Sequence, residues 1–256
     1  MGMYKILRNS MLLLGLSSSA ANADIISWDL NEGINYGSYH ASNLYSRGDL
    51  FLTVTGWSDT GGANDNKLER GALGRWNGLG ICNDDEYAQV HCASPQHAAD
   101  SEGGPDGDFD MFMLSFSEAV NVTSFQNGWY HHDADVSVLA YEGSDPAYDL
   151  TDKEWEGLLT DDWSVVGNYA DTATNETAVN TNISSKFWLI GVYNPIFGFI
   201  DDLCKEQNDM FKLLKVTIDD IVDCPEPVDC PEPAALGLLG FGLAGLAAKR
   251  RRKAKS

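Results

Sequence analysis

The chain has 256 residues, with 17 Lys and Arg side chains against 38 Asp and Glu side chains, a formal net charge of −21. Eight basic residues lie in the two ends of the chain, so residues 24–233 hold nine basic and 38 acidic side chains, a net charge of −29. A body with this much negative charge repels phosphate backbones, which excludes nucleic acid as the leading partner. The seven Trp, ten Tyr and ten Phe argue against intrinsic disorder.

The first 23 residues have the three parts of a secretory signal peptide. Lys5 and Arg8 give a positive start, an apolar run follows at 11–16, and a small-x-small cleavage site ends at Ala23. The alternative is a buried amphipathic helix, which these flanks do not favour. We therefore expect cleavage between Ala23 and Asp24, and a body that folds outside the cytoplasm.

From residue 24 to residue 222 the sequence has the pattern of short β-strands. Segments rich in β-branched and aromatic residues alternate with Gly, Asn, Asp and Pro. The pattern predicts strands at 50–55, 110–116, 120–130, 135–141, 163–169, 187–193 and 211–218. One short helix is predicted at 149–159, where Thr151 and Glu154 have capping-box spacing. These elements predict an all-β fold, a single antiparallel β-sandwich with jelly-roll-like topology.

The densest acidic segment, at 100–110, has five carboxylates and three glycines. Asp106, Asp108 and Asp110 have the spacing of the first three EF-hand ligands, and hard oxygen ligands on a loop suit Ca²⁺. The next EF-hand positions do not match, so the segment is not an EF-hand. Two interpretations remain: a Ca²⁺ site formed by these three residues, the one cofactor that the sequence suggests, or a solvated acidic loop that leads into a strand.

The sequence contains no recognisable catalytic motif. It lacks a Gly-x-Ser-x-Gly elbow, an HExxH helix and a CxxC pair, and its adjacent His131 and His132 would point to opposite faces of a strand. With 38 acidic residues, any pair of carboxylates carries little information. We therefore predict a non-enzymatic protein. Tryptophans could still stack on sugar rings, although most bulky aromatics lie in cores; the candidates are Trp57, Trp76, Trp129, Trp155, Trp163 and Trp188.

Five cysteines are present, an odd number that leaves at least one unpaired within the chain. Cys82 and Cys92 would close a short loop, and an exported protein folds where disulfides persist. We expect these two to be bridged. Cys204 and Cys224 form a reasonable second pair, which would leave Cys230 alone.

The C-terminal end consists of a linker, an apolar segment and a basic tail. Four prolines in 223–233 favour an extended linker. Residues 234–248 carry no charged or polar side chain, and six cations follow at 249–255. A helix of fifteen residues is about 22 Å long, so spanning a hydrocarbon core of about 30 Å needs snorkelling cations and a thinned bilayer. We expect 234–256 to be a single membrane-spanning helix whose basic tail lies in the cytoplasm, rather than a core helix.

This end of the chain resembles a known sorting signal. Pro231-Glu232-Pro233, the short Gly/Leu/Ala segment and the Arg-rich tail are similar to the PEP-CTERM signal of Gram-negative bacteria that make extracellular polysaccharide. The resemblance implies recognition of Pro231, Glu232 and Pro233 by exosortase, a membrane-embedded cysteine protease. An earlier copy of the motif at 224–227 looks like a duplicated linker.

The body resembles a subgroup of these proteins, the exosortase-dependent surface proteins. The similar stretches are 68–74, 78–81, 108–112, 128–130, 135–141, 188–194 and 211–216. This resemblance brings no catalytic residues with it.

Together these features predict an exported protein that is held in the inner membrane as a precursor and then moved to the cell surface or the extracellular matrix. Its body would have a structural or interaction role in the exopolysaccharide or biofilm matrix. The alternative function is that of a secreted carbohydrate-binding or carbohydrate-active protein.

Overall fold

The structure, a computed structural model, describes residues 25–33, 36–60, 66–84, 92, 97–101, 108–200 and 208–219. The chain divides into two units, Met1–Asp220 and Ile221–Ser256, and all described residues belong to the first. Within them, no helix is long and apolar enough to cross a membrane. Outside them lie the predicted signal cleavage site at Ala23 and Asp24, the linker, the motif Pro231-Glu232-Pro233 and the predicted membrane segment.

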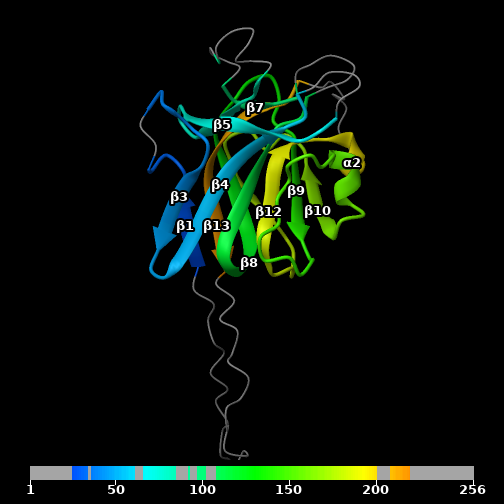
Figure 1. Cartoon of the computed structure of the whole chain (residues 1–256). Helices are drawn as coiled ribbons and strands as arrows, with labels where there is room; N and C mark the ends of the chain where they lie inside the picture. Colours follow the sequence, from blue (N-terminus) through cyan, green and yellow to red (C-terminus); the bar gives the residue numbers. More distant parts are fainter. Residues whose placement is uncertain are drawn as a thin grey trace, which may run out of the picture. The chain divides into compact units, whose positions relative to one another are not determined.

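The regular elements of the described body are nearly all antiparallel strands (Figure 1), which confirms the all-β prediction. Its helical elements in the described part are α2 (Trp155–Leu158) and the 3-10 turn η2 (Pro195–Phe197). The described strands are β1 (Ile25–Asp29), β2 (Tyr39–His40), β3 (Asn43–Arg47), β4 (Leu50–Ser58), β5 (Glu69–Arg75), β6 (Leu79–Cys82), β7 (Ala99–Asp100), β8 (Met111–Tyr130), β9 (Val136–Tyr141), β10 (Trp163–Tyr169), β11 (Glu176–Ala178), β12 (Ser185–Val192) and β13 (Met210–Asp219).

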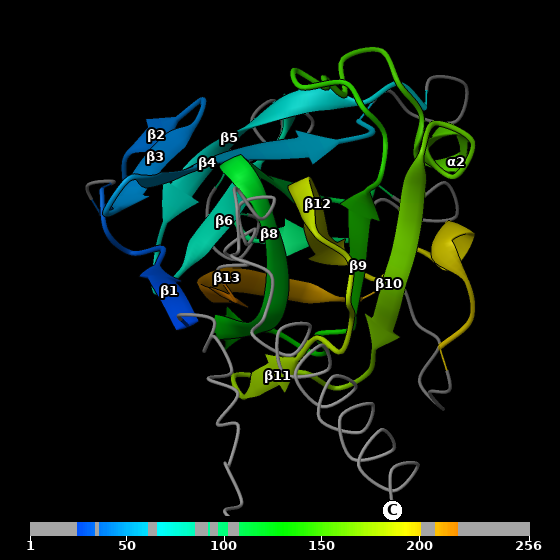
Figure 2. The ribbon, with the colours of Figure 1, turned by 90° about the horizontal axis from the view of Figure 1, so that it is seen from below.

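The strands form one continuous sheet that closes on itself. The sheet runs in the order β1-β13-β6-β5-β4-β8-β12-β9-β10, and a further pairing of β13 with β8 closes a ring of five strands. Figure 2 shows β4 and β5 on one side of the body and β13 on the other, with β6 and β8 between them. The layers of the predicted sandwich are thus joined into a single sheet, which β12, β9 and β10 extend beyond the ring.

β8 is the strand that allows this closure. Its residues 111–116 pair with β4 and, for most of that length, with β12, whereas residues 121–130 pair with β13. Residues 117–119, where the strand changes partners, are exposed. The sequence predicted two strands here because Ser117-Glu118-Ala119 interrupts the pattern of β-branched and aromatic residues.

One hydrophobic core fills the space inside the folded sheet. Phe112 on β8 and Phe211 on β13 meet inside the ring with their ring centroids 6.3 Å apart, and Trp28 packs against Phe116 at 5.5 Å. Such large side chains supply most of the apolar area that folding removes from water, and this burial is the main stabilising term.

The predicted helix at 149–159 is wrong in its start and its length. α2 begins at Trp155, and its N-cap residue Glu154 makes no capping hydrogen bond through its side chain. Asp149 instead accepts a hydrogen bond from the backbone N–H of Thr151 at 2.7 Å, and Asp152 has a φ of 60°. These two features form a turn that competes with helix formation.

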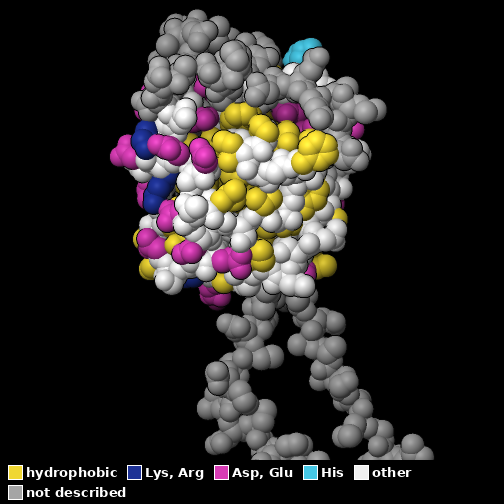
Figure 3. All heavy atoms as spheres, turned by 90° about the vertical axis from the view of Figure 1, so that its right-hand side faces the viewer, with side chains coloured by type: hydrophobic (Ala, Val, Ile, Leu, Met, Phe, Trp, Pro, Cys, Tyr) yellow, Lys and Arg dark blue, Asp and Glu magenta, His cyan; other side chains and the backbone are white. Residues whose placement is uncertain are grey.

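Basic side chains on the described surface are mostly paired with carboxylates. The ion pairs are Arg47–Glu32, Lys67–Glu154, Arg70–Asp149, Lys153–Asp161 and Lys215–Glu176. On the face shown in Figure 3 the few Lys and Arg side chains lie beside Asp and Glu side chains. Exposed pairs of this kind each contribute about 0–1 kcal/mol to stability. Because acidic side chains far outnumber basic ones, most of them stay without a basic partner.

Candidate ligand-binding pocket

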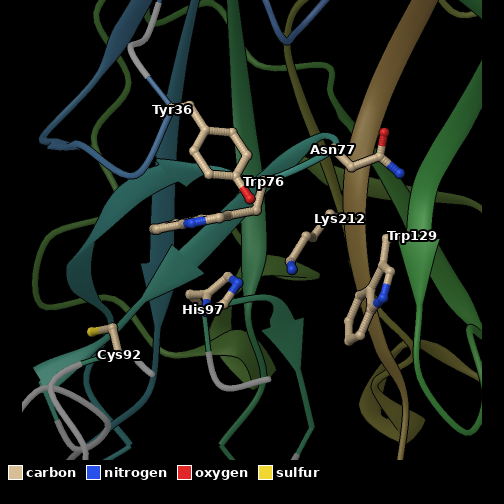
Figure 4. Close-up of a pocket in the computed structure, with 7 residues that line it drawn as sticks. All are labelled: Tyr36, Trp76, Asn77, Cys92, His97, Trp129 and Lys212. Carbon is tan, nitrogen blue, oxygen red and sulfur yellow. The ribbon is translucent and has the colours of Figure 1, made fainter. Parts of the chain in front are cut away.

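A cavity of about 620 Å³ opens on the body, a volume typical of small-ligand sites. It lies where the turn between β5 and β6 approaches the end of β8 and the start of β13 (Figure 4). Its described lining residues are Tyr36, Trp76, Asn77, Cys92, His97, Trp129 and Lys212.

Trp76 is held by the turn that joins β5 to β6. Asn77 and Gly78, the next two residues, have φ values of 61° and 121°, which suits a three-residue hairpin loop. The indole folds back over Gly74, where an added Cβ would lie 2.0 Å from a ring carbon of Trp76. The absence of a side chain at position 74 therefore makes room for the indole at the rim of the cavity.

Three aromatic side chains surround Trp76. The ring centroids of Tyr39 and Tyr36 lie 5.2 Å and 6.4 Å from that of Trp76, and the His97 ring lies at 4.0 Å. In Figure 4 the Tyr36 ring lies above the indole and the His97 ring below it. The half-buried indole is thus fixed by its neighbours and forms one wall of the cavity.

Trp129 and Lys212 form the facing wall. They are directly opposite each other in the pairing of β8 with β13, and the Lys212 Nζ atom lies 4.2 Å from the centroid of the Trp129 ring system. Such a distance allows a cation–π contact. Lys212 is 4% exposed, and burial lowers the pKa of its ammonium group to about 8. Figure 4 shows the ammonium end between His97 and Trp129.

The pocket contains two of the six tryptophans that the sequence made candidates for sugar stacking. Trp76 and Trp129 are half-buried. The other four, Trp57, Trp155, Trp163 and Trp188, are core residues with at most 3% exposure. One signal in the sequence separates Trp76 from these: it directly precedes Asn-Gly, a turn dipeptide, whereas nothing local marks Trp129.

The structure joins Cys82 and Cys92 in a disulfide, with Cα atoms 5.7 Å apart, inside the usual range for such bonds. Cys92 belongs to the pocket lining, and its backbone carbonyl accepts a hydrogen bond from the Tyr39 hydroxyl at 2.9 Å. The disulfide therefore ties the edge of the cavity to β6. The other three cysteines lie outside the described residues.

The structure describes two of the three residues of the calcium hypothesis. Asp106 lies outside the described residues and Asp108 is half-buried. Asp110 is fully buried, and its carboxylate accepts a hydrogen bond from the backbone N–H of Asp100 at 3.3 Å. Burial, with the nearby Asp100 charge, raises the pKa of Asp110 well above its usual value. Calcium binding by these residues stays a prediction.

A different acidic group, which the sequence did not reveal, is formed by Asp133, Asp135 and Asp209. One carboxylate oxygen from each lies within 4.8 Å of the others. Each carboxylate also accepts a backbone N–H: from Ala134 at 2.7 Å, from Asp171 at 2.8 Å and from Asp135 at 2.7 Å. The three residues lie after the end of β8 and before the starts of β9 and β13. The bond between Asp135 and Asp209 joins residues 74 positions apart in the chain.

Comparison with known proteins identifies the C-terminal end. Residues 229–252 match the family described as the PEP-CTERM protein-sorting motif. The match confirms the predicted sorting signal around Pro231-Glu232-Pro233, and it implies an exported protein that exosortase processes and that is sorted to the cell surface. No curated protein and no solved structure matches this chain.

Proposed function

We propose that this protein is a non-enzymatic component of the extracellular matrix whose body binds polysaccharide. The observation that carries the proposal is the pair of half-buried tryptophans, Trp76 and Trp129, on facing walls of one cavity. Sugar rings present C–H faces that pack well on indole rings, and a pocket of mainly aromatic lining with a few polar groups suits such a ligand. Sorting to the cell surface, which the C-terminal motif implies, supports the proposal because it would expose the pocket to polysaccharide outside the cell.

The lining of the pocket favours binding over cleavage. Glycoside hydrolysis uses two carboxyl groups about 5–10 Å apart on either side of the scissile bond. Neither Asp nor Glu is among the described residues that line the cavity. We therefore expect the mature protein to retain polysaccharide without releasing reducing sugar from it, which distinguishes it from the alternative of a carbohydrate-active enzyme.

The test is binding of the mature protein to polysaccharide purified from the matrix of its host. We expect Trp76→Ala and Trp129→Ala each to weaken binding about three- to tenfold, because each removes one aromatic wall. Tyr130→Ala is the matched control: Tyr130 is exposed, follows Trp129 in β8, and points to the opposite face of the strand. Unchanged affinity in both tryptophan variants would refute the pocket as the binding site.

A further inference from the structure

Lys212 stands apart from the other basic residues of the body. Five of the described Lys and Arg side chains form ion pairs, all of them at least partly exposed. Lys212 is the one described Lys or Arg that is buried, and no described carboxylate pairs with it. Arg75 and Lys186 also form no ion pair with a described carboxylate, but Arg75 is half-buried and Lys186 is exposed, whereas Lys212 is buried. Burying an unpaired charge is costly, so its position calls for an interaction partner.

The surroundings of Lys212 direct its charge into the pocket. The backbone is fixed by pairing of β13 with β8, and contact with the Trp129 ring holds the Nζ atom at the cavity wall. Figure 4 shows the ammonium group between the Trp76–His97 wall and Trp129. Because the pKa of Lys212 is about 8, most molecules carry the ammonium cation at pH 7.

We infer that the cavity accepts a negatively charged sugar residue, whose anionic group pairs with Lys212 while its ring packs against Trp129. The inference rests on the proposed function, because it treats the pocket as a sugar site and adds the charge of the sugar. A bound anion would give Lys212 the kind of ionic partner that carboxylates provide for five other cations of the described body. The rest of the acidic surface repels polyanions, so binding of an acidic polysaccharide depends on this one group.

The experiment compares one polysaccharide in three forms. Host matrix polysaccharide is used as isolated and after chemical reduction of its carboxyl groups to alcohols, which keeps the sugar backbone and removes the charge. A third sample, treated to remove sulfate and phosphate esters, distinguishes those anions from carboxylates. We expect the mature protein to bind the untreated form at least tenfold more tightly than the form that has lost the recognised anion.

Variants then assign the effect to Lys212. Lys212→Met should lose about tenfold in affinity for the untreated polysaccharide and bind the uncharged form like the parent, whereas Lys212→Arg should retain the preference for charge. Lys215→Met is the matched control, since Lys215 lies on the same strand, pairs with Glu176 and does not line the cavity. Melting temperatures of all variants show whether each one folds.

The outcomes separate the two proposals. If Lys212→Met binds the untreated polysaccharide as tightly as the parent, or if every chemical form binds equally, the charged-sugar inference is wrong and sugar binding itself stands. If no form binds while the protein is folded, both the inference and the proposed function fail.

Discussion

At the scale of single residues, Asp59 shows how burial of a carboxyl group makes the stability of the fold depend on pH. This residue follows β4, and its carboxylate accepts the backbone N–H of Phe109 at 2.8 Å. Burial, opposed in part by that hydrogen bond and reinforced by the charge of Asp108, raises the pKa of Asp59 to about 7. The usual value is 3.8, so folding costs more free energy once this carboxyl group ionises.

The sign of the effect on stability follows from linkage. A group whose pKa is raised on folding contributes fully to stability below pH 3.8, and this contribution is lost as the pH rises through about 7. Between pH 4 and pH 7 ionisation of Asp59 should lower the unfolding free energy of the parent protein by on the order of 2 kcal/mol. We predict that Asp59→Asn, which keeps the oxygen acceptor, removes this loss. Denaturant titrations across this pH range measure it. Exposed Asp49→Asn is the control, and parallel curves for Asp59→Asn and the parent would contradict the prediction.

At the scale of elements, the sequence predicted most of the longer strands, whose apolar residues alternate or run together, and it missed several shorter ones, among them β5 and β6. The observed β10 coincides with its prediction, and β9 differs by one residue. β5 and β6 contain Gly71, Gly74 and Gly80, which lower strand propensity. An added Cβ at Gly80 would lie 1.8 Å from the carbonyl oxygen of His97, so glycine is required by a close approach that sequence patterns do not show.

The pocket was only partly predictable for a related reason. The sequence offered six candidate tryptophans but did not show which two of them share a cavity. Lys212 and Trp129 become neighbours through the register of β13 with β8, two strands far apart in the chain. Local patterns carry no information about such pairing, which depends on how the whole sheet closes.

The disulfide is the element that fixes the pocket edge to β6. Cys82 and Cys92 close a loop of about ten residues, and cross-linking a loop of that size stabilises a protein by about 2–3 kcal/mol in the chain-entropy account. We predict that reduction lowers the unfolding free energy by about this amount, as measured by denaturant titration with and without reductant. The Cys82→Ser, Cys92→Ser double variant should lack this part of the response to reductant. Peptide mapping that found both thiols free in the mature protein would defeat this prediction.

At the scale of the whole molecule, the protein combines an acidic body with a basic end. Its nine basic residues between 24 and 233 leave a strong negative charge after export, while six cations lie in the last eight residues. Basic residues beside a membrane segment are held on the cytoplasmic side. If 234–256 is the membrane segment that the sequence predicts, an uncut tail would keep the body bound to the cell, and the proposed role in the matrix would require cutting near Pro231-Glu232-Pro233.

We predict that replacing Pro231, Glu232 and Pro233 by alanine leaves uncut precursor in the inner membrane. Proline keeps the backbone at this point from continuing a helix, and an extended backbone is the form that fits a protease active site. Fractionation with an antibody against the body, in the host and in a strain lacking exosortase, measures both size and location. Equal size and equal surface delivery in the two strains would instead indicate a plain membrane anchor.

The pairing of β1 with β13, the first and last described strands, also limits when the body can fold during export. Ile25 of β1 lies opposite Asp219 of β13, and β13 pairs as well with β6, β7 and β8. In a chain that crosses the membrane N-terminus first, the ring must stay open until β13 has emerged. Pro231 follows Asp219 by twelve residues, at most about 40 Å of chain. Folding of the body therefore cannot finish before β13 has emerged, and the sorting motif leaves the membrane channel only a short length of chain later.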